Sequence, residues 1–202
     1  MYFRPPKFIK RLFPSLRWNM EDQKSIYITF DDGPQPQITP WVLDMLSKYN
    51  AKATFFCIGK NAEQHPQIMA RIRAEGHAVG NHTYSHCKDL GIKSGPYLQD
   101  VDMANEYLQT NLFRPPYGRI SREQARQLSA RYHIIMWDIL SRDYSSWVSH
   151  HRCVRGVVPH LRGGSIVAFH DSLKASRNMR YTLPRLLSAA AEQGLECRAI
   201  EL

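Results

Sequence analysis

The chain has 202 residues, of which 43% are apolar, enough to bury the core of one domain and fewer than two domains usually need. Its 27 Lys and Arg against 18 Asp and Glu give a net charge of +9, but no dense basic run indicates a nucleic-acid partner, so we expect ordinary surface charge. No apolar run has the roughly 20 residues of a transmembrane helix, and none follows the N-terminal charges as in a secretion signal.

Residues 1–23 form a basic and aromatic segment in front of the predicted domain, residues 24–202. Its apolar residues recur at helix-like spacing at Ile9, Leu12, Phe13 and Leu16. We favour a strap packed against its own domain, and the alternative is a segment lying on a membrane surface. The four cysteines show no CxxC spacing, which favours free thiols. The sequence therefore predicts a cytoplasmic monomer that can contact the membrane through residues 1–20.

After the strap, short β-type runs alternate with helical patterns, as in folds built on a mostly parallel sheet. The predicted strands are residues 25–30, 53–58, 77–80, 112–114, 134–137, 165–169 and 196–200. Seven such units in so short a chain favour a closed or nearly closed barrel, because an open sheet needs more residues to cover both faces.

Residues typical of helix ends lie between these strands. In chain order they are Thr39 before Pro40, Gly76, Ser121 with Gln124 as a capping box, Thr182, and Gly194. Thr39, Ser121 and Thr182 are predicted to open helices, and the two glycines to close them. Further helices are expected near residues 94–109 and 147–161.

Polar residues suited to catalysis follow most of the predicted strands. They are Asp31 and Asp32 after the first, His82 and His86 after the third, Arg114 to Tyr117 after the fourth, Asp138 to Asp143 after the fifth, and His170 with Asp171 after the sixth. Because the carboxyl ends of parallel barrel strands meet on one face, we expect these side chains to gather there.

Asp31 and Asp32 fit either a simple turn or a carboxylate pair, of which one binds a metal and the other acts as a base. His82 and His86 are four residues apart, so they would share one face of a helical turn. With a carboxylate from another strand they form a His-His-Asp set that leaves room for water and substrate, as in catalytic metal sites. Zinc is the expected ion, and cobalt, nickel or manganese also suit these ligands.

Two further groups suit a hydrolytic site. Arg114 can orient a carboxylate, and the prolines that follow it would hold the Tyr117 backbone N–H toward a developing oxyanion, although a plain loop is the alternative. Asp143 would raise the pKa of His170, which could then act as a general acid. The competing interpretation is that His170 is a buried core residue whose ring nitrogens are hydrogen-bonded and which has no role in catalysis.

Five ordered motifs resemble those of the polysaccharide deacetylases of carbohydrate esterase family 4, also called the NodB-homology domain. They are Thr29-Phe30-Asp31-Asp32-Gly33-Pro34, His82-Thr83-Tyr84-Ser85-His86, Arg114-Pro115-Pro116-Tyr117, the segment from Trp137 to Tyr144, and a fifth that ends at His170-Asp171. The resemblance implies a distorted seven-stranded (β/α) barrel. It also implies a metal-dependent hydrolase that removes N-acetyl groups from an amino sugar of a glycan and releases acetate.

The resemblance implies roles for individual residues as well. The implied metal ligands are Asp32, His82 and His86. The implied catalytic residues are Asp31 as general base, Arg114 that orients it, His170 as general acid, Asp143 that tunes it, and Tyr117 as the oxyanion donor.

The substrate pocket is expected at Pro115, Pro116, Tyr144 and Ala168. Tyr144 stands where the family usually has Trp, and Ala168 where it usually has Leu. A neighbour such as Phe169 or Val167 would fill the space beside Ala168, or a larger acyl group would occupy it. We therefore expect altered substrate preference with the chemistry retained.

Two other functions stay open at this point. One is a hydrolase of the same fold that acts on another C–N bond, such as a formyl or imide group. The other is a non-catalytic carbohydrate-binding protein, against which the presence of a base, an acid and three metal ligands argues. The expected partner is an N-acetylated glycan substrate.

Overall fold

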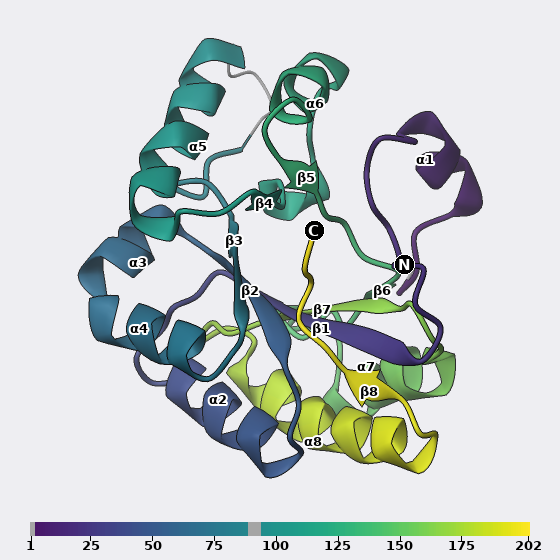
Figure 1. Ribbon diagram of the computed structural model, residues 1–202. Coiled ribbons are helices and arrows are strands. Elements are labelled where there is room, and N and C mark those ends of the chain that lie inside the picture. Colours follow the sequence, from purple (N-terminus) through teal and green to yellow (C-terminus); the bar gives the residue numbers. More distant parts are fainter. Residues whose placement is uncertain (1–2, 89–93) are drawn as a thin grey trace.

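The computed structural model describes residues 3–88 and 94–202 and shows a curved sheet of parallel strands covered by helices (Figure 1). The strands are β1 Ser25–Asp31, β2 Ala53–Cys57, β3 Ala78–Asn81, β4 Leu112–Phe113, β5 His133–Ile134, β6 Ile139–Leu140, β7 Ile166–His170 and β8 Glu196–Cys197. The helices are α1 Lys7–Leu12, α2 Thr39–Lys48, α3 Gly59–Gln64, α4 Pro66–Ala74, α5 Ser94–Leu108, α6 Arg122–Leu128, α7 His150–Val157 and α8 Ser176–Glu192, with 3-10 turns η1 Pro116–Gly118 and η2 Val158–His160.

Seven strands form one continuous path in the order β5-β4-β3-β2-β1-β7-β6, and β8 pairs with the first residues of β1 beside this path. Neighbouring strands along the path are parallel. The predicted distorted seven-stranded (β/α) barrel is therefore confirmed. The path ends at β5 and β6, and no ladder joins these two strands within the described ranges.

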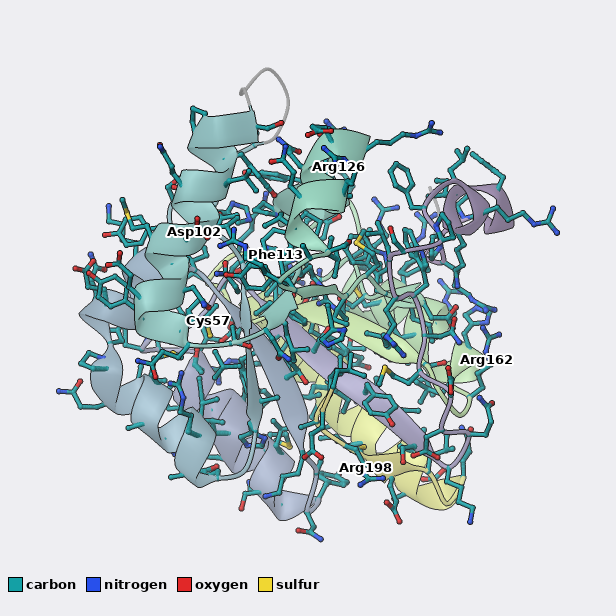
Figure 2. All side chains as sticks on the ribbon, turned by 45° about the horizontal axis from the view of Figure 1, so that its top comes forward. Cys57, Asp102, Phe113, Arg126, Arg162 and Arg198 are labelled. Atoms are coloured by element: carbon teal, nitrogen blue, oxygen red, sulfur yellow. The ribbon has the colours of Figure 1, made fainter. Side chains whose placement is uncertain are left out.

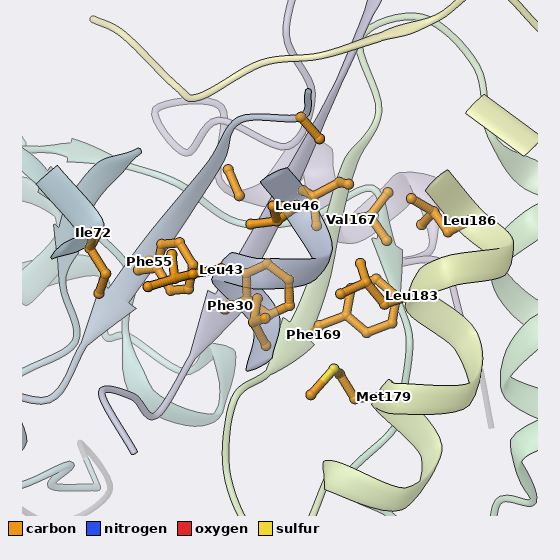
Figure 3. Close-up of a cluster of buried hydrophobic side chains, with 14 of the residues drawn as sticks. Phe30, Leu43, Leu46, Phe55, Ile72, Val167, Phe169, Met179, Leu183 and Leu186 are labelled. Atoms are coloured by element: carbon orange, nitrogen blue, oxygen red, sulfur yellow. The ribbon is translucent and has the colours of Figure 1, made fainter. Parts of the chain in front are cut away.

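Strand β1 is buried along its whole length because it lies in the middle of the sheet with both faces covered. Its apolar residues on one face, among them Phe30, pack with Phe55 and Phe169 of the neighbouring strands at ring-centroid distances of 5.1 and 5.9 Å. Figure 3 shows these rings against Leu43 of α2 and Leu183 of α8. The opposite face of β1 points into the barrel and ends in Asp31.

The two ends of the barrel interior differ. The end nearest the amino termini of the strands is apolar and includes Tyr27, Ile166 and Ile200. The C-terminal tail crosses this end (Figure 1), where the Ile200 backbone N–H donates to Thr54 Oγ1 at 2.8 Å. Functional polar residues are thereby confined to the opposite end.

The N-terminal strap closes the gap between the two ends of the strand path. The Arg17 backbone N–H donates to the Ile134 carbonyl at 2.8 Å, and Arg17 in turn accepts from Met136 at 2.7 Å. Met20 donates to Gly164, just before β7, at 2.8 Å. The segment packs against the domain, which is the arrangement that we favoured from the sequence. The boundary between strap and domain at residue 23 stays a prediction. None of the helices in the described ranges has the length and hydrophobicity of a membrane span.

The strap is also anchored by charge. Asp138, buried near the start of β6, accepts from Lys10 at 3.0 Å, from Arg4 at 3.3 Å and from Arg162 at 3.0 Å. Figure 2 shows Arg162, Arg126 and Arg198 on well-separated parts of the surface, while Phe113 lies inside. This distribution agrees with dispersed surface charge.

Several element boundaries differ from the sequence expectation. Strand β6 was not predicted, since two residues give no periodic pattern, and the expected strand at 196–200 is reduced to β8. One helix was expected before Gly76, but Pro66 lacks the N–H that would continue α3, so α4 begins there. The capping box of Ser121 and Gln124 is confirmed.

Helix α2 begins at Thr39 as predicted, but neither Thr39 nor Thr182 caps a helix with its side chain. Thr39 makes no capping hydrogen bond, and its hydroxyl donates instead to Asp171 Oδ2 at 2.5 Å. Helix α8 begins at Ser176, and Thr182 lies buried inside it. The buried face of α8 includes Met179, one turn before Leu183. The apolar pattern therefore extends the helix to a start before Thr182.

Candidate active site

An open cavity of about 740 Å³ lies over the carboxyl ends of the strands. Seven of the residues singled out in the sequence line it, namely Asp31, Asp32, His82, His86, Tyr117, Tyr144 and His170. Because β1 and β7 are paired in register, Asp31 and His170 are direct neighbours across the two strands. The fold therefore gathers residues from distant parts of the chain into one place.

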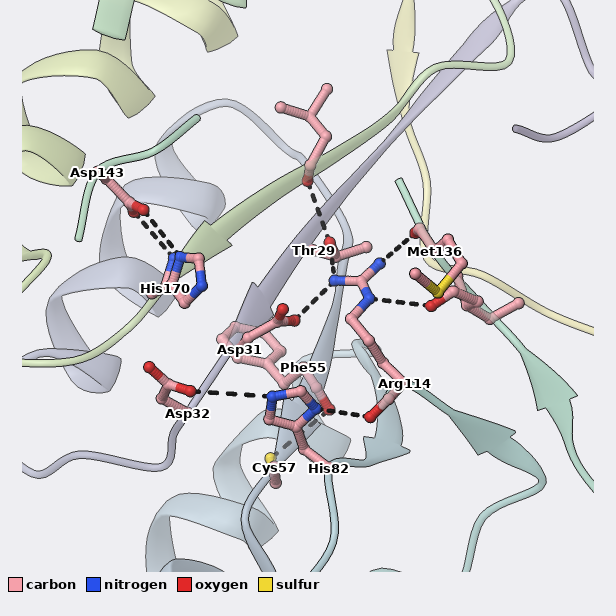
Figure 4. Close-up of polar contacts among 12 residues, drawn as sticks. Thr29, Asp31, Asp32, Phe55, Cys57, His82, Arg114, Met136, Asp143 and His170 are labelled. Carbon is pink, nitrogen blue, oxygen red and sulfur yellow. Dashed lines mark hydrogen bonds and ion pairs between the residues drawn. The ribbon is translucent and has the colours of Figure 1, made fainter. Parts of the chain in front are cut away.

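Arg114 lies fully buried inside the barrel beneath this cavity, and Figure 4 shows its guanidinium beside Asp31. Its Nη1 donates to Asp31 Oδ1 at 2.6 Å and to Thr29 Oγ1 at 2.7 Å. The Nε and Nη2 groups donate to the carbonyls of Ile135 and Met136 at 3.1 and 2.7 Å. These fixed acceptors aim the guanidinium at Asp31, as the sequence suggested.

The ionisation of Asp31 reflects two opposing effects. Burial would by itself raise the pKa of this carboxyl, but the charge and hydrogen bond of Arg114 together with the charges of His82 and His170 outweigh it, so the pKa of Asp31 lies below its usual range. Asp31 is only 3% exposed, and Arg114, at 2.6 Å, is the strongest of the groups that keep it charged. A carboxylate held in this way is available as a base, though a weaker one than an unpaired carboxylate.

Asp32, His82 and His86 converge on one point. The Asp32 Oδ1 atom lies 3.3 Å from His86 Nε2 and 3.9 Å from His82 Nε2, and one ligand atom from each residue falls within 4.8 Å of the others. Figure 4 shows Asp32 and His82 facing each other. Asp31 is the deeper carboxylate, on Arg114, so the two adjacent aspartates point to different partners.

The two histidines reach this point by a different route from the expected helical turn. Residues 82–88 form an irregular loop after β3, in which Thr83 and His86 have φ angles of 63° and 54°. Asp100 of α5 fixes the loop, because its Oδ2 accepts from the backbone N–H groups of Tyr84 and Ser85 at 2.9 and 3.0 Å. Left-handed backbone conformations, which spacing does not reveal, bring the imidazoles together.

The tautomer of His82 follows from its partner. Its Nδ1 lies 2.7 Å from the Arg114 carbonyl oxygen, which can only accept, so Nδ1 carries the proton. Burial lowers the pKa of His82 to about 4, which keeps the ring neutral. The unprotonated Nε2 therefore faces Asp32 as a ligand atom.

This donor set fits a divalent metal ion. Two imidazoles and one carboxylate supply three ligands from one side, and the cavity leaves the other side open. Three protein ligands with an open position are typical of catalytic rather than structural zinc sites. The residues present therefore suit the ion that the sequence predicted, without selecting zinc over cobalt, nickel or manganese.

His170 forms a pair with Asp143, the dyad drawn in Figure 4. Its Nδ1 lies 2.8 Å from Asp143 Oδ1, and its backbone N–H donates to Asp143 Oδ2 at 2.9 Å. Burial opposes protonation of the ring, but the charge and hydrogen bond of Asp143, together with the charges of Asp32 and Asp31, outweigh it and raise the pKa of His170 to about 9. A protonated histidine at the cavity wall can donate a proton to a leaving group.

Tyr117 and Tyr144 both line the cavity, each beside a different histidine. Tyr117 has a left-handed φ of 59° inside η1, and its ring packs on His86 at 4.7 Å between centroids. The ring of Tyr144 meets His170 edge-on at 4.7 Å. Both residues therefore contact the proposed metal ligand or acid directly.

Three predicted pocket residues do not line the cavity. Pro115, Pro116 and Ala168 are buried behind it. The neighbours Val167 and Phe169, proposed to fill the space at Ala168, belong to the core on the other face of the sheet. The residue that lines the cavity at this position comes instead from β6, which pairs with β7.

Leu140 of β6 is that residue. It is the register partner of Ala168, and its side chain lines the cavity. The lining residues that sequence reasoning missed are Leu140, Trp137, Gly118, Arg119, Lys88, Ser172 and Lys174. Trp137 and Leu140 lay within the fourth motif and Arg119 just after the third, so their proximity to motif residues was the available signal.

Asp171 received no role from the sequence, yet it supports the turn that follows β1. Its buried carboxylate accepts from Thr39, and a Cβ atom on Gly33 would collide with it. Burial raises the pKa of Asp171 to about 7. Gly33 follows the two aspartates directly, so Asp171 and Thr39 help to set the conformation of that turn.

The comparisons with known proteins agree with this site. The family described as polysaccharide deacetylase matches residues 19–134, which is more than half of the chain. A peptidoglycan-N-acetylglucosamine deacetylase of Bacillus cereus is 32% identical over 196 residues, covering 92% of both chains. The chain belongs to the polysaccharide deacetylase family. The predictions of this family and of a hydrolase acting on C–N bonds other than peptide bonds are thereby confirmed.

Other deacetylases in the comparisons are similar over different lengths. A second Bacillus cereus peptidoglycan-N-acetylglucosamine deacetylase is 34% identical over 158 residues, and the match spans 75% of this chain but only 57% of that protein. A chitooligosaccharide deacetylase of Azorhizobium caulinodans is 33% identical over 75% of each chain. The crystal structure of a peptidoglycan N-acetylglucosamine deacetylase in complex with 4-naphthalen-1-yl-N-oxidanyl-benzamide superposes with a TM-score of 0.89 at 27% identity, covering 97% of this chain and 95% of the other.

Proposed function

We propose that this polysaccharide deacetylase is a metal-dependent enzyme that hydrolyses the acetamide of an N-acetylated amino sugar and releases acetate. The observation that carries the proposal is that the two adjacent aspartates have different partners. Asp32 faces two imidazoles, while Asp31 pairs with buried Arg114 and lies beside His170 in the same cavity. A ligand set, a base and an acid thus surround one open space.

Asp32, His82 and His86 would hold the metal, and zinc is the ion we propose. When bound, a divalent cation polarises an amide carbonyl and lowers the pKa of a coordinated water. The neutral state of His82, with its Nε2 unprotonated, keeps that ligand ready at neutral pH.

Asp31 is the proposed general base. Arg114 fixes one of its oxygens, which leaves the carboxylate oriented and charged. As water attacks the acetamide carbon, Asp31 takes the proton that the water loses. The backbone N–H of Tyr117 is the proposed donor to the oxygen that becomes negative.

His170 is the proposed general acid. Asp143 holds its Nδ1, so the ring presents the other nitrogen to the cavity. In the protonated ring, that Nε2–H gives its proton to the amide nitrogen as the C–N bond breaks, and the products are acetate and a free amine. Asp143 then stabilises the ring through the cycle by opposing charge.

Measurement of released acid tests this proposal directly. Incubation of the zinc-loaded protein with a chito-oligosaccharide or a peptidoglycan fragment is expected to release acetate, and removal of the metal by a chelator to stop it. Parallel assays with formyl and imide substrates separate the alternative of another C–N bond. Absence of turnover on every substrate with metal bound would instead support the carbohydrate-binding alternative.

The surroundings in which the protein acts are also a proposal. All four cysteines are free, which supports a reducing, cytoplasmic location. On α1 the side chains of Phe8 and Leu12 are 62% and 51% exposed beside Arg11, which supports a contact with a membrane surface. A monomer without a nucleic-acid partner stays a prediction.

A further inference from the structure

A second cavity, apolar and about 310 Å³ in volume, adjoins the catalytic one. Its apolar lining consists of Ile9, Phe13, Leu16, Trp18, Ile120 and Met136. Four of these belong to the N-terminal strap, so the strap and the barrel together form the walls. Apolar surface left open to water at this site is stabilised by a ligand that covers it.

The two cavities share a wall. Gly118 and Arg119 line both of them, so the last residue of η1 and the residue after it form the ridge between the cavities. Gly118 has a φ of 64°, and a Cβ atom there would collide with Trp137, so the backbone lies directly on that ring. Trp137 lines the catalytic cavity and its neighbour Met136 the apolar one. One ligand can therefore extend over this ridge into both.

Cationic side chains stand at the mouth of the catalytic cavity. Arg119, on the ridge, is exposed, as are Lys88 and Lys174, which also line the cavity. Lys88 lies 5.6 Å from the centre of the Tyr117 ring. Within the described ranges none of these three cations forms an ion pair with a carboxylate. Arginine in such a position suits a phosphate group of a ligand.

We propose that the substrate is an N-acetylated amino sugar linked through phosphate to an apolar chain. This inference rests on the proposed deacetylase function and names the substrate class for the same site. The sugar occupies the catalytic cavity, the phosphate lies near Arg119, and the chain enters the apolar cavity. A neutral glycan polymer would use neither the three cations, which have no carboxylate partner among the described residues, nor the apolar walls.

Five substrates test the two features separately. Four are N-acetylglucosamine derivatives: a methyl glycoside, a decyl glycoside, a methyl phosphodiester and a decyl phosphodiester, each used below its micelle concentration. The fifth is a chito-oligosaccharide that reports deacetylation without either feature. The readout is kcat/KM for acetate release by the zinc-loaded full chain. We expect the decyl phosphodiester to exceed the methyl phosphodiester by about tenfold or more.

Two variants test the assignment of the cavities. Ile120→Asn places a polar group in the apolar cavity and is expected to bring the decyl-to-methyl ratio close to one. Arg119→Gln is expected to lower the ratio of phosphodiester to glycoside. Ile68→Asn, at another half-buried isoleucine on α4, and Arg122→Gln, at an exposed arginine on α6, are the matched controls and should keep both ratios. Because each ratio compares substrates on one protein, partial loss of folded enzyme does not change it.

The outcomes separate this inference from the proposed function. Acetate release from the chito-oligosaccharide without a preference for the decyl phosphodiester would overturn the inference alone. A preference that survives in both Ile120→Asn and Arg119→Gln would overturn the placement of the chain and the phosphate. No acetate from any of the five substrates would overturn the proposed function and the inference with it.

Discussion

Arg114 is the residue on which the chemistry of the site depends most. A fully buried guanidinium is tolerated only where its charge and donors are satisfied, and here two backbone carbonyls, Thr29 and Asp31 do so. The same pairing lowers the pKa of Asp31 and so reduces its strength as a base. The pairing also orients the Asp31 carboxylate and keeps it charged, which suits a base that must not be protonated near neutral pH.

The acid has the opposite requirement, and its pH dependence is testable. The pKa of His170 is raised to about 9, so the proton is present at neutral pH and turnover should fall as pH rises through about 9. A bound divalent cation would bring this loss to lower pH. Asp143→Asn removes the charge that raises the pKa, so the alkaline limb of kcat against pH should shift to lower pH.

An alkaline limb that does not move in Asp143→Asn would contradict the assignment of His170 as the acid.

The pair of His170 and Asp143 also contributes to the stability of the fold, and the sign of its pH dependence can be stated. Because the folded pKa of His170 lies above its unfolded value near 6.5, this contribution is complete below about pH 6.5 and is lost as pH rises through about 9.

Most single residues of the site could be named from the sequence, because their types and order carry the chemistry. What the sequence could not give was their local geometry. His86 and Tyr117 adopt left-handed conformations that spacing does not encode, and the buried Asp171 looked like any residue at the end of a strand. Leu140 became a lining residue through pairing with Ala168, which depends on long-range register.

At the scale of elements, the N-terminal strap fills the gap in the barrel between β5 and β6. Its backbone pairs with residues on both sides of the gap, and the Phe3 carbonyl accepts from Leu140 of β6 at 2.7 Å. Leu140 lines the catalytic cavity, so the strap supports one wall of the site as well as the barrel. The spacing of apolar residues indicated a helix in this segment, but only the tertiary structure shows which gap the strap fills.

Removal of the buried charge at Asp138 tests how firmly the strap is held. Asp138→Asn leaves Lys10, Arg4 and Arg162 without their carboxylate, and the loss of charged hydrogen bonds should destabilise the fold by about 1–3 kcal/mol. Denaturant unfolding measures this loss. Faster tryptic cleavage after Lys10, Arg11 or Arg17 should accompany it.

Asp44→Asn is the matched control for Asp138→Asn, since it removes an aspartate of the same charge whose side chain is 62% exposed and pairs with Arg71 at the surface. Its cost should stay below about 0.5 kcal/mol. Equal effects of the two substitutions would show that the strap does not depend on the buried pairing.

At the scale of the whole molecule, the parallel barrel explains why motifs scattered along the chain meet. Strand pairing places the ends of β1 and β7 side by side, β3 lies next but one to β1, and the C-terminal tail covers the opposite end. The alternation of strands and helices made this architecture predictable. The short strands β6 and β8 were not, because two residues carry no periodicity and their pairing is decided by distant partners.

Metal binding to the folded state should stabilise the whole molecule. A ligand at 100 times its Kd adds about 2.7 kcal/mol, which for a chain of this size raises Tm by about 5–10 °C. Thermal unfolding with and without zinc measures the shift. His82→Ala should abolish it, whereas an equal shift in that variant would place the ion elsewhere.

The division between the two aspartates is tested most directly by measuring zinc content and acetate release together in Asp31→Asn and Asp32→Asn. Asp31→Asn should retain about one zinc per chain and lose on the order of 10²-fold or more in kcat, since it keeps the ligand set and loses the base. Asp32→Asn should lose both zinc and turnover. Near-wild-type turnover in Asp31→Asn, or full zinc content in Asp32→Asn, would contradict the account.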